Sequence, residues 1–182
     1  MNLPEGFRLA RGFARAVPID DLRGAIPWEQ RSISMFGRTI PQPRLTAWMG
    51  SAAYTYSRQR HEPAPLPFGV WRLRQCVERE AGATFNSVLA NLYRDGRDSV
   101  AWHADDEPEL GDDPVIASLS FGATRDFHVR HNLSRQRWTI PLAHGDLLVM
   151  LPGVQRAYQH AIPKARDPVG VRINLTFRAV AG

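Results

Sequence analysis

The segment Trp102–Leu110 (WHADDEPEL) concentrates ionisable chemistry, because its nine residues include one histidine, two aspartates and two glutamates. In an extended chain, residues two apart point to the same side, so His103 and Asp105 are predicted to face one way and Asp106 the other. An imidazole nitrogen and a carboxylate oxygen aimed at one point can bind a metal ion. The segment therefore predicts half of a metal site, with a solvated acidic loop as the alternative.

A third ligand must come from elsewhere in the chain, and His160 in RAYQHAIP is the candidate. Two histidines and one carboxylate leave further coordination positions open, a pattern typical of non-haem Fe(II) oxygenases. Each piece is weak when taken alone, since a lone histidine beside a strand is more often structural. A mononuclear zinc hydrolase would use the same three ligands, and the ligand pattern by itself does not exclude it.

The last predicted strand, VRINLTFRAV, has one apolar face and one polar face. Strand alternation gives the polar face four residues: Arg172, Asn174, Thr176 and Arg178. An outer sheet face in water often has this composition. Alternatively, the two arginines could line a pocket and bind carboxylates. A zinc hydrolase would have no obvious use for such a pocket.

A second strand, within residues 84–94, could add to such a pocket. Alternation aims one set of side chains to the same side: Phe85, Ser87, Leu89, Asn91 and Tyr93. Asn91 and Tyr93 supply hydrogen-bonding groups suited to an acid.

The periodicity of the chain changes near residue 84, from helical to alternating. The first half contains a helix at 67–82, with Pro67 near its start and Gly82 as its cap, and a weaker helix at 18–26. The second half contains short strands separated by turn signals such as GDDP, GATR and HGD. This order predicts an α+β fold whose antiparallel sandwich or barrel carries the chemistry.

Composition agrees with one folded domain, since 43% of the 182 residues are hydrophobic and 23% are charged. No apolar run reaches the roughly 20 residues of a membrane span, and the first residues lack the apolar stretch of a secretory signal. Cys76 is the single cysteine, which excludes an internal disulfide and favours the cytoplasm. The net charge is +5, and every basic residue except Lys164 is an arginine. This composition suits a polyanionic partner, but a codon bias toward arginine would also explain it.

Taken together, these blocks resemble the AlkB family of Fe(II)/2-oxoglutarate dioxygenases. NLYRDGRD, HADDEPEL, PVIASLSFG, LAHGDLLVM and RINLTFR occur in the family's order, within about residues 34–178. The resemblance implies a double-stranded β-helix, or jelly roll, preceded by N-terminal helices. It also implies one domain over 1–182, with a nucleotide-recognition lid at 34–57 and a jelly-roll core at 84–178.

The resemblance further implies that His103, Asp105 and His160 hold Fe(II), with 2-oxoglutarate and O2 as co-substrates. Arg172 would bind the distal carboxylate of 2-oxoglutarate with help from Tyr93, and Arg178 would lie near its other carboxylate. The remaining polar lining would comprise Asn91, Asn174 and Thr176. His144 is off the ligand spacing and is expected to be a loop residue.

On the substrate side, the resemblance implies contacts to a flipped, methylated base. Asp106 and Glu107 would face the base, because N-methylation makes it cationic. The element Tyr54, Thr55, Tyr56 would place an aromatic ring, at Tyr56, on the base, although aromatic residues also favour ordinary strand packing. Arg38 and Arg44 would meet phosphates.

The tip Met35-Phe36-Gly37 resembles a finger that fills the gap left by a flipped base in a duplex. A phenylalanine packed in the core is the alternative. The finger predicts activity on double-stranded as well as single-stranded DNA.

The function implied is oxidative demethylation of bases such as 1-methyladenine and 3-methylcytosine, with release of formaldehyde, succinate and CO2. The expected protein is a monomer that acts on methylated DNA, and the sequence does not decide between DNA and RNA. Two alternatives stay open: an oxygenase acting on a protein or small molecule, and a non-catalytic nucleic-acid binder.

Overall fold

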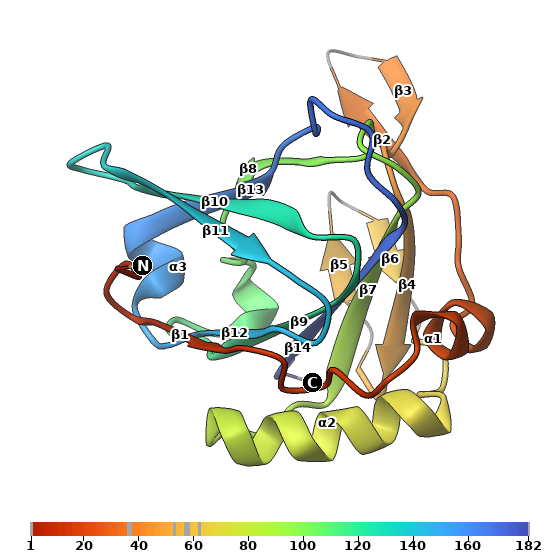
Figure 1. Cartoon of the computed structure of the whole chain (residues 1–182). Coiled ribbons are helices and arrows are strands. Elements are labelled where there is room, and N and C mark those ends of the chain that lie inside the picture. The colour runs from red at the N-terminus through yellow and green to blue at the C-terminus, as the bar shows by residue number, and fades with distance from the viewer. Residues whose placement is uncertain (1, 36–37, 53, 57–58, 62, 182) are drawn as a thin grey trace.

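The structure is a computed structural model that describes residues 2–35, 38–52, 54–56, 59–61 and 63–181. Within 33–35, 38, 54–56 and 59–61 it describes the backbone alone. Two antiparallel sheets dominate the described part of the chain, with helices outside them (Figure 1). This is the α+β arrangement that the sequence predicts.

The larger sheet has six strands and draws on both ends of the chain. Its order is β1 (Phe7–Ala10), β12 (Leu147–Met150), β9 (Ile116–Gly122), β14 (Arg172–Arg178), β7 (Ser87–Tyr93) and β4 (Leu45–Gly50). The strand β14 is central and pairs with β9 on one side and β7 on the other. A pocket built on β14 is therefore supported from both sides.

The smaller sheet faces the larger one and has the order β11 (Arg137–Leu142), β10 (Arg125–His131), β13 (Tyr158–Ile162) and β8 (Val100–His103). The short strands that alternation predicts after residue 84 are confirmed as β7 to β12 and β14. The strand β13 was not predicted, because its five residues, YQHAI, show no clear alternation.

The helix α2 (Phe68–Ala81) covers the outer side of the six-stranded sheet and lies below it in Figure 1. It begins after Pro67 and ends at Gly82, whose φ of +68° is the left-handed conformation that glycine adopts readily. The helix α1 (Ile19–Ala25) packs beside it. Both helices confirm the sequence prediction. Two further elements are short: the 3-10 turn Pro108–Leu110 and α3 (Val154–Ala157).

The apolar residues form two cores separated by the larger sheet. Ile173, Leu175 and Phe177 of β14 belong to the core between the larger sheet and the helices. The second core lies between the two sheets and includes Trp48 and Phe127. Because helices cover one face of the larger sheet and a second sheet covers the other, neither face of β14 is an outer surface in water.

Two small hairpins lie beside this framework: β2 (Ser32–Met35) with β3 (Arg38–Pro41), and β5 (Tyr54–Tyr56) with β6 (Gln59–His61). The first hairpin begins at Ser32, just before the lid expected at 34–57, and the second begins at Tyr54, within it. The strand β4 also falls in that range, yet it pairs with β7 along its whole length and forms the edge of the larger sheet. The two sheets therefore take residues from well before residue 84. Among the described residues, no helix is both long and apolar enough to cross a membrane.

Candidate metal centre and co-substrate pocket

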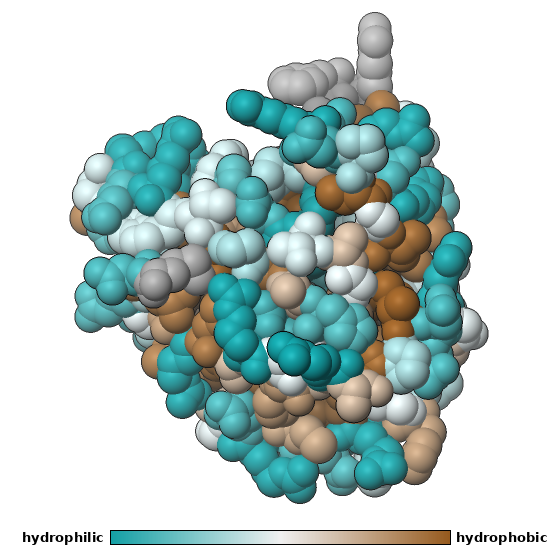
Figure 2. Space-filling model, in the orientation of Figure 1, coloured by the Kyte–Doolittle hydropathy of each residue, from teal (hydrophilic) through white to brown (hydrophobic). Residues whose placement is uncertain are grey.

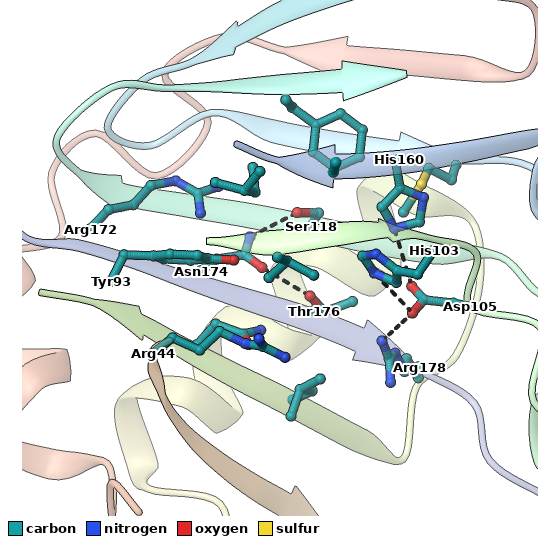
Figure 3. Close-up of a pocket in the computed structure, with 17 residues that line it drawn as sticks. Arg44, Tyr93, His103, Asp105, Ser118, His160, Arg172, Asn174, Thr176 and Arg178 are labelled. Carbon is teal, nitrogen blue, oxygen red and sulfur yellow. Dashed lines mark hydrogen bonds and ion pairs between the residues drawn. The ribbon is translucent and has the colours of Figure 1, made fainter. Parts of the chain in front are cut away.

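Three side chains converge between the sheets to form a candidate metal centre: His103, Asp105 and His160 (Figure 3). His103 ends β8 and is paired in register with His160 on β13, so the two imidazoles lie side by side. Their Nε2 atoms each lie 4.0 Å from a carboxylate oxygen of Asp105. One ligand atom from each residue lies within 4.8 Å of the others, which suits a single cation.

Strand alternation does not explain why the Asp105 side chain lies beside the two histidines. The strand β8 ends at His103, so Asp105 lies in irregular chain beyond it. Its main-chain N–H donates to Oε1 of Gln155, at 2.9 Å, and one carboxylate oxygen accepts a hydrogen bond from Arg178. These contacts, rather than alternation along a strand, set the direction of the side chain.

The electrostatics of the three groups fit a cation. Burial alone would raise the pKa of Asp105, but Arg178, His160 and His103 together lower it. Burial, with His103 close by, lowers the pKa of His160 to about 3. At neutral pH the set therefore offers a carboxylate and a neutral imidazole at His160, the forms that bind a metal.

A cavity extends from the metal centre to the far end of β14. The polar residues of β14 all lie inside it and are buried: Arg172, Asn174, Thr176 and Arg178. Their partners form a chain across the cavity wall, since Thr176 donates to Asn174 and Asn174 donates to Ser118. The polar face of the last strand is thus an interior wall.

Arg172, at the end of the cavity opposite the metal centre, carries spare hydrogen-bonding capacity (Figure 3). It is 1% exposed, and its Nη2 donates to Ser120 Oγ at 2.9 Å. Its Nε and Nη1 are buried without a hydrogen-bond partner among the described residues, and burial lowers its pKa. Its guanidinium lies 5.1 Å from the ring centroid of Tyr93. A buried cation with two unused donors matches a carboxylate.

Arg44 differs from its sequence expectation. It was expected to meet phosphates, but it is 7% exposed and lines the cavity. Its Nε donates to Oδ1 of Asn91 at 2.7 Å, which places it beside the expected 2-oxoglutarate residues. A buried guanidinium cannot reach a backbone phosphate at the surface. Arg44 lies within the segment expected to form the lid, and the pairing of β4 with β7 is what brings it to the cavity.

The expected base-contacting residues are placed only in part. Asp106 is exposed and Glu107 is half-buried, both just past the metal centre. Phe36 and Gly37 lie outside the described residues. Arg38 and the run 54–56 are described as backbone, in β3 and β5, so the contacts of Arg38, Tyr54, Thr55 and Tyr56 stay predictions.

Three other observations refine the sequence reading. Phe127, whose position gave no sequence signal, stacks on His160 with ring centroids 5.1 Å apart. Phe85 is predicted on the same face as Asn91, but it precedes β7 and packs in the core between the larger sheet and the helices. His144 stands outside the metal group, as expected, and accepts a hydrogen bond from the Gly122 N–H.

Comparisons with known proteins place the chain in a family. The family model described as the 2OG-Fe(II) oxygenase superfamily matches residues 14–178. The chain is 50% identical over 166 residues to alpha-ketoglutarate-dependent dioxygenase alkB homolog 3 of Rattus norvegicus, covering 85% of this chain and 56% of the relative. It is 39% identical over 158 residues to DNA oxidative demethylase ALKBH2 of Homo sapiens, covering 81% and 60%.

The solved structure titled "The structure of OsALKBH1" superposes with a TM-score of 0.67, at 18% identity, covering 98% of this chain and all of that one. The expected jelly-roll fold is therefore confirmed. The chain belongs to the 2OG-Fe(II) oxygenase superfamily, and within it the relatives confirm the resemblance to the AlkB family. It spans between half and two thirds of the length of these curated relatives.

Proposed function

We propose that this chain oxidatively demethylates N-alkylated bases in DNA, such as 1-methyladenine and 3-methylcytosine. The reaction would consume 2-oxoglutarate and O2 and release succinate, CO2 and formaldehyde. The observation that carries the proposal is that one cavity holds both a three-ligand metal group and a buried arginine with two unused donors.

The residues present fit both bound groups. His103, Asp105 and His160 would hold Fe(II), and the distal carboxylate of 2-oxoglutarate would accept hydrogen bonds from Arg172. When bound, iron and 2-oxoglutarate would activate O2, the oxidant, so that one oxygen atom enters succinate as 2-oxoglutarate loses CO2 and the other converts an N-methyl C–H bond to C–OH. An N-hydroxymethyl group then loses formaldehyde, as the O–H proton leaves and the C–N electrons return to the base.

The surrounding side chains have orienting roles in this proposal. Arg178 keeps Asp105 ionised through its contact with the carboxylate. Asn91, held by Arg44, and Asn174, held on Ser118, present fixed amide groups to the co-substrate. Asp106 and Glu107 would face the cationic base just beyond the iron.

A nucleic-acid substrate is supported by charge as well as by the names of the relatives. The β10–β11 hairpin projects from the smaller sheet, and Figure 2 shows hydrophilic side chains gathered over its tip. Arg135 and Arg137 on this hairpin are exposed. The guanidinium of Arg130 lies 4.5 Å from the ring centroid of Trp102, whose side chain alternates along β8 with that of His103 and so lies on the other face of the smaller sheet. We call Trp102, Arg130, Arg135 and Arg137 the hairpin patch, a surface suited to phosphates and unstacked bases.

The direct experiment measures succinate formed from 2-oxoglutarate with and without a single-stranded oligonucleotide containing 1-methyladenine. The proposal expects slow turnover without DNA and a strong increase with the methylated strand, but not with the unmethylated one. Turnover that no methylated nucleic acid stimulates would favour an oxygenase acting on a protein or a small molecule. A parallel assay with methylated RNA decides which polymer is preferred.

A further inference from the structure

The main chain at Asp105 needs support from outside its own strand. Asp105 is 3% exposed, and β8 has already ended at His103, so no sheet ladder satisfies its N–H group. A buried N–H without an acceptor costs about 1–3 kcal/mol. In this chain the acceptor is the side chain of Gln155, whose Oε1 lies 2.9 Å from the Asp105 nitrogen.

Gln155 belongs to a different part of the chain, the short helix α3 between β12 and β13. It is 5% exposed, and its Nε2 donates to the sulfur of Met150 at 3.5 Å. Met150 itself lines the cavity. Both ends of the amide are therefore engaged, which fixes the direction in which its oxygen points.

The position of α3 gives this contact a consequence for the metal centre. The helix α3 leads directly into β13, which carries His160. The hydrogen bond from Asp105 to Gln155 thus ties the segment that carries one ligand to the segment that precedes another. Arg178 holds the Asp105 carboxylate, but Gln155 holds its main chain.

We propose that Gln155 is a positioning residue for the metal centre, which fixes the main chain of Asp105 so that its carboxylate meets the two histidines. The inference rests on the proposed metal centre. Outer partners that orient metal ligands typically contribute 10- to 100-fold to metal affinity. Loss of the Gln155 oxygen should therefore weaken metal binding more than it weakens the fold.

The test is an anaerobic Co(II) titration, followed by visible absorption, of the wild-type chain and of Gln155→Met. Methionine keeps the length of the side chain but removes the acceptor. The dissociation constant for Co(II) should rise about tenfold or more. Gln155→Glu, which keeps an oxygen at the same chain length, should recover most of the affinity.

Glu78→Met is the matched control, because Glu78 Oε1 accepts the Phe85 N–H at 2.8 Å, away from the cavity. This variant should lower the melting temperature without changing the Co(II) affinity. If Gln155→Met does not fold, Gln155→Asn replaces it, since its amide is one methylene too short to reach Asp105.

The outcomes separate the two proposals. Failure of the wild-type chain to bind Co(II) would overturn the metal centre itself. Normal wild-type binding, with equal affinity in the Gln155 variants or an equal loss in Glu78→Met, would leave the metal centre intact and show that Gln155 is an ordinary buried amide.

Discussion

Arg172 is the residue whose burial and unused hydrogen-bond donors indicate most directly what kind of ligand the cavity binds. Its buried charge is incompletely satisfied, and burial lowers its pKa, so the charge is unfavourable while no anion is near. A carboxylate at this end of the cavity would remove that penalty. The same residue on a solvated strand would carry no such information.

The first prediction concerns Arg172→Met. Without 2-oxoglutarate, the variant should melt at the same temperature as wild type or higher, because a poorly paired buried charge is replaced by an apolar side chain. With Mn(II) and 2-oxoglutarate, wild type should gain stability and the variant should gain little. Differential scanning fluorimetry measures both, with exposed Arg156→Ala as the control. An undiminished response of Arg172→Met to 2-oxoglutarate would contradict the pocket assignment.

The second prediction concerns Phe36, at the expected finger. If this ring fills the gap left by a flipped base, it matters only where a stacked partner strand exists. Phe36→Ala should lower repair of methylated duplex DNA by roughly tenfold or more, equivalent to about 1.4 kcal/mol, and barely change repair of single strands. Equal losses on both substrates, together with a lower melting temperature, would show that Phe36 belongs to the core.

At the scale of elements, the end of β9 is a point where backbone geometry supports the site. Gly122 has a φ of +83° and is paired in register with Arg172. A Cβ at this position would lie 2.5 Å from Ile19 Cδ1 and nearer still to the carbonyl oxygen of Val171. Only glycine fits this position without displacing the Ile19 side chain and the Val171 carbonyl, which lies just before β14.

The third prediction follows from that crowding. Gly122→Ala should lower the free energy of unfolding by at least about 2 kcal/mol, from backbone strain and the clash together. Gly24→Ala, in α1, should be neutral or stabilising, since nothing lies within 4 Å of its added Cβ and alanine favours helices. Urea denaturation compares the two variants. A Gly122→Ala chain as stable as wild type would contradict the packing described for this corner.

The elements also show where sequence reasoning succeeds and where it stops. Pro67, Gly82 and the alternation of β14 are local signals, so α2 and the polar wall were predictable. Arg44 and Gln155 join the site through contacts between segments far apart in the chain, for which no local pattern exists. Asp105 was predicted correctly as a member of the metal group, but strand alternation is not what positions it.

At the scale of the whole molecule, the net charge is positive and nearly all of the basic residues are arginines. Three of these arginines lie in the hairpin patch. Burial, then the like charges of Arg135 and Arg137, lowers the pKa of Arg130. Mutual repulsion of this kind is relieved by a polyanion, which supports the proposal that a nucleic-acid strand lies across this face.

The fourth prediction is a salt dependence that the hairpin patch controls. Single-strand affinity should fall steeply with salt, with a slope of about −0.7 for each phosphate neutralised. The double variant Arg135→Ala/Arg137→Ala should weaken binding to all sequences alike and flatten that slope. Arg72→Ala/Arg79→Ala, on the exposed side of α2, should leave the slope unchanged. Equal slopes for wild type and both double variants, measured by fluorescence anisotropy, would place the strand elsewhere.

The most direct test of the account is to follow the methylated base itself. A single-stranded oligonucleotide with one 3-methylcytosine is incubated aerobically with the chain, Fe(II) and 2-oxoglutarate, and its mass is measured over time. We predict loss of the methyl group, one formaldehyde for each cytosine restored, and no change with Asp105→Ala or without 2-oxoglutarate. Consumption of 2-oxoglutarate while the base keeps its methyl group, or demethylation by Asp105→Ala, would contradict it.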